Sequence, residues 1–318
     1  MNKLMTVVAA SVCAVSLSGS AFAAENQSVQ KADAAAAKEA AENLEEEEDK
    51  LYEAGFDFDF LSAYVWRNAI QTDEMVMEPC VWADFTGLDP FWFGFSIWQN
   101  YDLTDRRRES YRHGLTETDY NVHVGVVAWS SEDGALGLEA EIGHEWYDNL
   151  GVHRDSVDSQ TDSAEVYAKL TFKNPVVEVY GLASYMYKDF GDYLPGMYYE
   201  LGFKREIDLC SDLECLPKGD LLDSLTLGAD WTVGFGDNRY NNYIFGTPHQ
   251  GFGGTTLKFY LNWGITEWVK LCGTIAYTGV INGAQRDSLA DLGSDYGWDG
   301  DNYARDLLWG GVSLKFEF

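Results

Sequence analysis

Histidine is the side chain best suited to acid–base catalysis near neutral pH, and this chain has five of them. His123 could form an acid–base cluster with Glu139 and Glu141, although ordinary ion pairing accounts for the same residues. His144 could be the base of a lipid-cleaving enzyme, but Trp146 stands where the serine of such a pair would be needed. No GxSxG motif occurs either. The sequence therefore predicts no catalytic residue and no enzyme, with an outer-membrane hydrolase as the weaker alternative.

Cysteines and carboxylates could also form crosslinks or bind metals. Cys210 and Cys215 are separated by four residues in one polar segment, which predicts a local disulfide in an oxidising compartment. Cys80 and Cys272 fall in separate predicted strands and are expected to be free thiols. No CxxC, HExxH or Cys/His zinc spacing occurs, so we expect no metal and no cofactor. The acidic stretch 294–302 lacks the spacing of an EF-hand, which favours a solvated loop over a divalent-cation site.

Net charge sets a further limit on function. Asp and Glu total 52 against 22 Lys and Arg, which gives a net charge of −30. General binding to nucleic acid is therefore excluded, because phosphate binding needs a positive surface. No run of about 18 uncharged apolar residues follows the first segment, so a helical membrane protein is excluded as well.

The elements that position these residues follow from hydrophobic alternation. In the last twelve residues, LLWGGVSLKFEF, Leu308, Val312 and Phe316 share one face, and Ser313 and Lys315 share the other. Such alternation is typical of a β-strand. The segment is longer than a usual soluble strand of about 5–6 residues and fits a tilted membrane strand of about 9–11 residues.

Eleven further segments show the same pattern. We expect strands near 55–66, 75–85, 91–101, 118–129, 136–146, 163–173, 176–187, 197–206, 224–234, 255–264, 268–278 and 307–318. Tight turns (TGLDP, SSEDG, KNP and ITE) alternate with long polar loops near 102–117, 147–162, 235–254 and 279–306. This arrangement predicts one antiparallel transmembrane β-barrel of about twelve strands rather than a soluble β-sandwich. Two features fit less well. Pro79 predicts a bulge in the second strand or a later start, and the link 207–223 is long for a turn.

The N-terminal residues differ from the rest of the chain. Residues 1–24 are predicted to be a secretory signal peptide, with Lys3, an apolar stretch and the small-residue site Ala21-Phe22-Ala23. Residues 25–50 are rich in Ala and Glu and predict an acidic, partly helical periplasmic leader, with a spacer or partner-binding helix as the alternative. The barrel is then expected to occupy 51–318, with both of its ends in the periplasm.

One stretch carries a family resemblance. Residues 60–100, FLSAYVWRNAIQTDEMVMEPCVWADFTGLDPFWFGFSIWQN, resemble the opening hairpins of the TorF-type porins, the Gcw-chp family. Ser62, Tyr64 and Arg67 match the S-x-Y-x-x-R-G pattern of that family, and Asn68 stands where the family usually has Gly. The later segments EVYAKLTFKNPVVEVYG and GMYYELGFKREI resemble its central hairpins. The resemblance implies a pore in the outer membrane of a Gram-negative-type bacterium and brings no catalytic residues.

The polar phase of the strands is expected to line a lumen. Burying so many charges in a dry core would cost several kcal/mol each unless they were paired, so a water-filled lumen with ion pairs across it is the simpler interpretation. The predicted pore-lining residues are Asp57, Asp59, Arg67, Asp84, Glu139, Glu141, Lys169, Glu178, Glu200, Lys204, Asp230, Lys258, Lys270 and Lys315. The same inward phase also holds Glu78, Glu145, Glu165, Lys173, Glu206 and Glu317.

Acids outnumber bases about two to one in this lumen, and a net negative bore attracts cations and repels anions. We therefore expect passive diffusion of small cationic or neutral solutes. A closed ion-paired plug and a non-conducting scaffold or adhesin are the alternatives. The expected partners are outer-membrane lipid and the assembly machinery that reads Phe318. Lipopolysaccharide is a further partner if Arg106, Arg107 and Arg108 meet its phosphates rather than the acidic loops of the chain itself.

Overall fold

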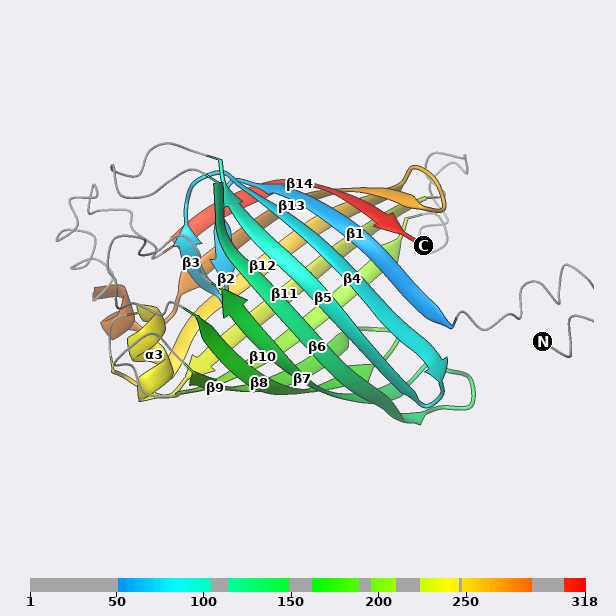
Figure 1. The fold of residues 1–318 in the computed structure, drawn as a ribbon, viewed down its shortest axis with the longest axis horizontal. Coiled ribbons are helices and arrows are strands. Elements are labelled where there is room, and N and C mark those ends of the chain that lie inside the picture. Colours follow the sequence, from blue (N-terminus) through cyan, green and yellow to red (C-terminus); the bar gives the residue numbers. More distant parts are fainter. Residues whose placement is uncertain are drawn as a thin grey trace, which may run out of the picture. The chain divides into compact units, whose positions relative to one another are not determined.

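The computed structural model describes residues 51–103, 114–148, 162–188, 196–209, 224–245, 248–287 and 306–318. Within them, twelve antiparallel strands close into a barrel (Figure 1), in which β1 completes the ring by pairing with β14. The predicted all-β barrel of twelve strands is confirmed. Its strands are β1 Tyr52–Leu61, β4 Val76–Leu88, β5 Phe91–Asp102, β6 Gly114–Ser130, β7 Gly137–Asp148, β8 Ser163–Lys173, β9 Glu178–Lys188, β10 Gly196–Asp208, β11 Leu225–Gly236, β12 Gly251–Gly264, β13 Val269–Val280 and β14 Asp306–Glu317.

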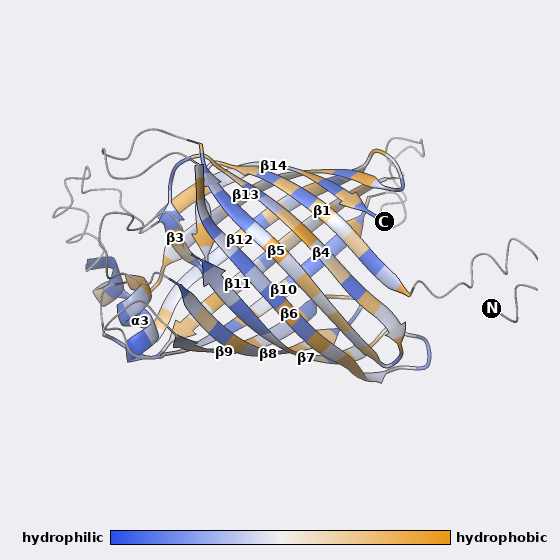
Figure 2. Cartoon of the chain, viewed as in Figure 1, coloured by the Kyte–Doolittle hydropathy of each residue, from blue (hydrophilic) through white to orange (hydrophobic). Residues whose placement is uncertain are grey.

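Hydrophobicity alternates along these strands (Figure 2). Large apolar side chains are exposed on the outer surface, where Ile142 keeps 60% and Val122 keeps 56% of its surface accessible. The carboxylates of Glu78 and Glu165 lie on the inner side and are 8% and 0% exposed. This is the inverse of a water-soluble protein. It fits a transmembrane barrel whose outer face meets hydrocarbon and whose polar face lines a lumen.

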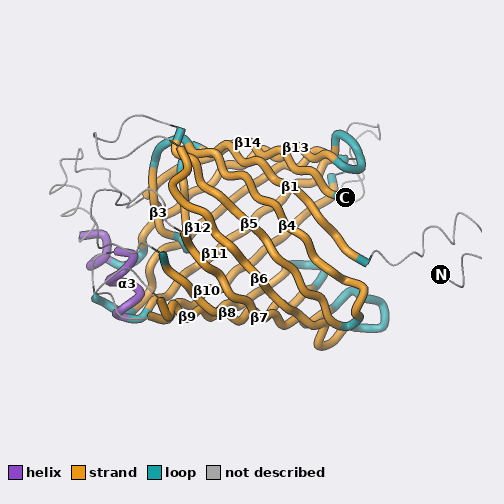
Figure 3. The backbone as a smooth tube through the Cα atoms, viewed as in Figure 1, coloured by secondary structure: helices purple, strands orange, loops and turns teal. Residues whose placement is uncertain are grey.

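The links between strands alternate in length, as the sequence predicts. Short turns join β4 to β5, β6 to β7, β8 to β9 and β12 to β13 at one end of the barrel. At that end the last residue pairs with the start of β1, since the Phe318 amide donates to the Ala54 carbonyl at 2.8 Å. The link between β10 and β11 follows at the same end and is longer, as the sequence indicates for 207–223. The other long links join strands at the opposite end, where Figure 3 shows the helical segments.

Pro79 lies within a regular strand, without the bulge or the later strand start that the sequence predicts. The strand begins at Val76 and passes through Pro79 in register with β1, where Pro79 lies opposite Phe58. The ladder to β5 is interrupted at Glu78 and Pro79 and resumes at Cys80 without a shift of register. Both a later start and a bulge at Pro79 are therefore wrong, because a missing proline donor needs only a local gap in one ladder.

The first predicted strand, 55–66, is too long. β1 ends at Leu61, and residues 64–66 belong to a separate short strand, β2 Tyr64–Trp66, which pairs with β3 Ala69–Thr72 in a two-stranded sheet of their own. The alternation of Tyr64 and Trp66 continues the pattern of β1, so the hydrophobic period does not reveal where the chain leaves the wall.

The predicted polar loop 235–254 contains a helix, α3 Asn238–Phe245. Asp237 caps it, since its Oδ1 accepts the amides of Arg239 and Tyr240 at 3.0 and 2.8 Å. Tyr240 and Phe245 on this helix are buried. Within the described segments, no helix is long and apolar enough to span a membrane.

Glycines on the inner wall make room for aromatic rings. A Cβ atom placed on Gly143 would lie 2.3 Å from the ring of Tyr167, its cross-strand partner, so only glycine fits there. The same close approach occurs in the ladder pairs Gly125–Trp92, Gly202–Tyr180 and Gly228–Tyr260. Each ring therefore lies against the backbone of the adjacent strand.

Candidate functional site

The short hairpin β2–β3 carries the candidate site at its tip. Its two turn residues, Arg67 and Asn68, have φ angles of 50° and 61°. Two successive residues with positive φ form the tight two-residue turn that joins β-hairpins, and asparagine tolerates this conformation better than most residues. The turn places the guanidinium of Arg67 and the amide of Asn68 side by side at the end of the hairpin, where both reach the barrel wall.

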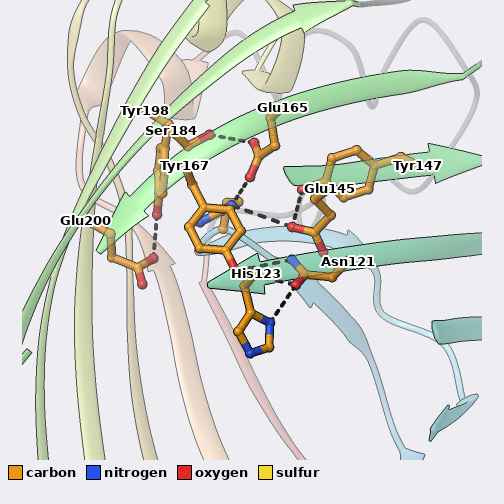
Figure 4. Close-up of polar contacts among 10 residues, drawn as sticks. Asn121, His123, Glu145, Tyr147, Glu165, Tyr167, Ser184, Tyr198 and Glu200 are labelled. Atoms are coloured by element: carbon orange, nitrogen blue, oxygen red, sulfur yellow. Dashed lines mark hydrogen bonds and ion pairs between the residues drawn. The ribbon is translucent and has the colours of Figure 1, made fainter. Parts of the chain in front are cut away.

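Arg67 binds two carboxylates on neighbouring strands, those of Glu145 and Glu165, which lie near each other in Figure 4. Its guanidinium donates to Glu165 on β8, which is fully buried, and lies 3.9 Å from Glu145 on β7. Two further donors complete the cluster: the Ser184 hydroxyl donates to Glu165 at 2.6 Å, and the Tyr147 hydroxyl donates to Glu145 at 2.9 Å. Glu145 and Glu165 lie directly opposite each other in the β7–β8 ladder. Like charges in that position repel, and Arg67 supplies the positive charge that the pair needs.

Asn68 binds the other side of the wall. Its Nδ2 donates to Glu200 at 2.9 Å and to the Tyr198 hydroxyl at 3.1 Å on β10, and its Oδ1 accepts from Thr232 on β11 at 2.5 Å. A Cβ atom on Gly254 of β12 would lie 1.9 Å from the Asn68 carbonyl oxygen, so a glycine there allows the hairpin to come this close. The tip of the hairpin thus contacts β7, β8, β10, β11 and β12, which means that it crosses the lumen.

Aromatic rings hold the sides of the hairpin. Trp66 packs edge-on against Tyr147 of β7, with ring centroids 5.4 Å apart, and lies 6.3 Å from Tyr240 of α3. Tyr240 in turn stacks on Tyr198 at 4.9 Å. Tyr64, at the base of the hairpin, lies 5.3 Å from Trp98 of β5. The hairpin is therefore seated in a matched pocket of the lumen and is not a free loop.

The described residues line two cavities in the lumen beside the hairpin. One, of about 260 Å³, is lined by Arg67, Asn68 and Glu200 among others, and the second, of about 410 Å³, by Asp59, Glu78 and Lys315 among others. Both cavities share Val65, Asp230, Lys258 and Trp309 as lining residues, so they adjoin. The lumen is therefore narrowed by the hairpin but not filled by it.

Seven of the predicted pore-lining residues border these two cavities: Asp59, Arg67, Glu200, Lys204, Asp230, Lys258 and Lys315. The others are found mainly in charge pairs and aromatic contacts along the wall: Asp57 with Lys315 at 3.9 Å, Asp84 with His123 at 3.0 Å, Glu139 with Lys173 at 2.6 Å, Lys270 with Glu317 at 2.5 Å, and Lys169 over the Tyr180 ring at 5.0 Å. Glu141 lies opposite Lys169 and Glu178 opposite Lys204 in the strand ladders. Whether solutes pass these residues stays a prediction.

The histidines considered for catalysis have other partners. His123 lies 3.0 Å from Asp84 across β5, where Gly94 leaves the space between them, so its neighbour is not the expected Glu139 or Glu141. His144 lies on the outer face with its Nε2 2.6 Å from the Tyr187 hydroxyl. Neither geometry brings a serine or cysteine nucleophile to the imidazole within the described residues.

Cys80 and Cys272 are free thiols, as expected. Cys210, Cys215, Arg106–Arg108, the stretch 294–302 and residues 1–50 lie outside the described residues, so their predictions are untouched by the structure. Among the residues that are described, no three histidine, cysteine or acidic side chains gather where a metal ion could bind.

The sequence reasoning placed Glu145 and Glu165 in the inward phase but did not single them out, and it missed Asn68, Tyr198 and Thr232. A signal for the acidic pair was present. Once β7 and β8 are aligned, two carboxylates face each other and require a nearby cation. No pattern in the sequence identifies Arg67 as that cation, since it lies about a hundred residues away along the chain.

Solved structures offer a comparison for the fold. The chain is similar to an outer membrane channel from Pseudomonas putida F1, with 10% sequence identity, a TM-score of 0.46 and coverage of 84% of this chain and 94% of that one. It is also similar to the NanC porin (10% identity, TM-score 0.46, 83% and 98% covered) and to outer membrane phospholipase A from Escherichia coli (15% identity, TM-score 0.43, 83% and 92% covered). No protein-family model matches the chain, and no curated protein matches it in sequence. At these identities the likeness concerns the fold and not the activity.

Proposed function

We propose that this chain is a channel for the passive diffusion of small cationic or neutral solutes. The observation that carries the proposal is a closed barrel with an apolar exterior, whose acid-rich interior keeps two adjoining cavities beside a seated hairpin. Charged side chains line these cavities from several strands, and their burial in a dry interior would cost several kcal/mol each. Water in the lumen removes that cost and provides a path for solutes.

The selectivity follows from the balance of charge. Most lysines of the lumen are already paired with a carboxylate, as in Lys258–Asp230 at 3.6 Å and Lys204–Glu206 at 3.2 Å. Arg67 lies within ion-pair distance of two carboxylates, those of Glu145 and Glu165. The remaining carboxylates give the bore a negative potential, which raises the local concentration of cations and lowers that of anions.

The test is a reversal potential. The purified full-length barrel is inserted into a planar bilayer with a KCl gradient across it. A cation-preferring bore gives a reversal potential whose sign is that of the potassium equilibrium potential. A reversal potential of the opposite sign, which means anion selectivity, would contradict the proposal.

We place the channel in the outer membrane of a Gram-negative-type bacterium, within the TorF-type porin family, with both barrel ends in the periplasm. Asn68 at a positive φ supports the family assignment, because the family usually has glycine at that position and glycine adopts the same conformation. The short turns at the end where β1 and Phe318 meet support the orientation, since periplasmic turns of such barrels are short. The signal peptide 1–24, the leader 25–50, the Cys210–Cys215 disulfide, lipopolysaccharide contact and recognition of Phe318 by the assembly machinery belong to this proposal. Cell fractionation and external protease accessibility test the location and orientation.

A non-conducting scaffold is the second candidate, and the seated hairpin is the observation that favours it. If the hairpin leaves no continuous water path, the barrel is only an anchor. Liposome swelling with sugars of graded size separates the two functions, since a scaffold gives no swelling with any sugar. A hydrolase is not proposed, and a phospholipid-hydrolysis assay on wild type and His144→Ala tests this.

A further inference from the structure

The larger lumen cavity has a charge imbalance at one end. It is lined by four acids, Asp59, Glu78, Glu206 and Asp230, and three lysines, Lys204, Lys258 and Lys315. Lys204 pairs with Glu206, Lys258 pairs with Asp230, and Lys315 faces Asp57 on β1 at 3.9 Å. Every lysine of the cavity is thus matched by an acid. Within the described residues, Asp59 and Glu78 form no ion pair, so no lysine of the cavity is left to pair with them.

Asp59 and Glu78 are also neighbours. They lie directly opposite each other in the β1–β4 ladder. Glu78 is only 8% exposed, and its Oε1 has no hydrogen-bond partner among the described residues. The Oδ1 of Asp59 is buried and lacks a partner in the same way. Two facing carboxyl groups with unused acceptor oxygens are suited to a donor that brings positive charge.

The excess of acceptors continues along the same wall. Asn100 on β5 and Asp119 on β6 each have a buried side-chain oxygen without a partner in the described part of the chain. Asn100 and Asp119 lie outside the cavity lining, whereas Asp230, which has an unpartnered buried Oδ1 as well, belongs to it. The orphaned oxygens of Asp59, Glu78 and Asp230 are acceptors, so a ligand that meets them must donate hydrogen bonds. An ammonium group offers three N–H donors and the missing charge in one small unit.

Besides its ion pairs, the cavity has uncharged polar side chains in its lining. Tyr260, Asn262, Thr274 and Ser313 supply hydroxyl and amide groups, and Trp309 adds an indole to the lining. The volume of about 410 Å³ leaves room for a small solute beside the acidic pair. A ligand that suits all these features has an ammonium group at one end and hydroxyl groups on the remainder.

We propose that Asp59 and Glu78 form a binding site for the ammonium group of a small hydrophilic primary amine in this cavity. The amine enters with its ammonium group toward the two carboxylates and its hydroxyl groups toward β12–β14. The inference names a solute class for the proposed channel, and it rests on that function only in requiring that solutes reach the lumen.

The test measures equilibrium binding in detergent, so it does not depend on conduction. Glucosamine is the probe, and glucose is the matched neutral control, because the two differ by an ammonium group in place of a hydroxyl. Isothermal titration is run on the wild-type chain and on Asp59→Asn, Glu78→Gln and the control Glu139→Gln. Glu139→Gln also removes one lumen carboxylate, but one that is paired with Lys173 outside the cavity lining.

We expect wild type to bind glucosamine in preference to glucose. Asp59→Asn and Glu78→Gln should each weaken glucosamine binding by about tenfold or more, as expected for the loss of a buried charge-assisted contact. Glu139→Gln should stay within about twofold of wild type. Heat-modifiable migration on gels and far-ultraviolet circular dichroism verify that each variant is folded. Equal binding of glucose and glucosamine, no binding of glucosamine, or equal affinity in all variants would overturn the site.

A planar-bilayer arm separates this inference from the proposed function. If wild type conducts, glucosamine should reduce the potassium current, and Asp59→Asn should relieve the block. If wild type binds glucosamine but carries no current, the amine site stands and the channel proposal fails. If wild type conducts but glucosamine neither binds nor blocks, the channel proposal stands and the amine site fails.

Discussion

Removing the guanidinium of Arg67 should weaken the contacts that hold the tip of the β2–β3 hairpin against the barrel wall. The variant Arg67→Ala leaves Glu145 and Glu165 opposite each other without a cation, and Glu165 is fully buried. Breaking a buried ion pair by deleting one partner costs roughly 3–5 kcal/mol. Asn68 retains three side-chain hydrogen bonds, which contribute about 1 kcal/mol each and somewhat more where the partner is charged. The substitution therefore removes about half of the polar anchoring of the hairpin tip.

The lost anchoring should appear in the current. Undocking lets water reach both carboxylates, so the hairpin should spend more time away from the wall and the lumen should widen. In planar bilayers we expect Arg67→Ala to show a larger mean conductance and more frequent transitions between levels than wild type. Arg67→Lys, which keeps the charge but loses the planar two-pronged donor geometry, should give an intermediate result.

A double variant controls for general damage. Arg67→Ala with Glu165→Gln removes one of the two uncompensated carboxylates, so it should be more stable in urea than Arg67→Ala alone. If Arg67→Ala conducts with the same amplitude and the same noise as wild type while remaining folded, the guanidinium does not hold a constriction and the reasoning is refuted.

Three further substitutions test the rest of the structure. Ile142→Lys places a charge on the outer face and should cost about 2–4 kcal/mol if the residue lies near the bilayer midplane, as measured by urea unfolding in lipid vesicles; a cost near zero would show that this face does not meet lipid. Gly143→Ala should destabilise the barrel because its Cβ would collide with the Tyr167 ring, whereas Gly181→Ala, with open space around its Cβ, should be tolerated; equal unfolding midpoints would argue against the ring packing. Asn68→Gly keeps the turn conformation but loses three hydrogen bonds, so it should raise conductance less than Arg67→Ala does. A larger increase than that of Arg67→Ala would show that Asn68, and not Arg67, contributes more to holding the hairpin tip.

The strands of the barrel could be predicted from sequence because lipid and lumen impose opposite requirements on alternate residues. The segment 163–173 illustrates this, since its period-two pattern matches β8 at both ends. The residues of the short turns also predicted where two strands end: β8 ends at Lys173 and β12 at Gly264, each just before a short link to the next strand. Pro79 gave a misleading signal, because a proline in a ladder needs only a gap on one side.

The contacts between the β2–β3 hairpin and the barrel wall could not be predicted from the sequence, and the reason is physical. Strand alternation states which side chains point inward, but the partner of each depends on distances across the lumen. Tyr64 and Trp66 extend the apolar pattern of β1, so the point where the chain turns inward is hidden. Arg67 meets Glu165 and Asn68 meets Thr232 only because the barrel has closed, and closure is a property of all twelve strands together.

The order in which these contacts can form has a consequence for biogenesis. The hairpin is made directly after the first strand, yet its tip binds side chains 98, 130, 132 and 164 residues later in the chain. Contacts between residues so far apart in the sequence form late, because the entropy cost of closing a long loop comes before the contact can stabilise the structure. During assembly the hairpin tip would therefore gain its partners one strand at a time, from β8 to β11, and one of the earliest segments of the barrel would reach its final position in the lumen among the last.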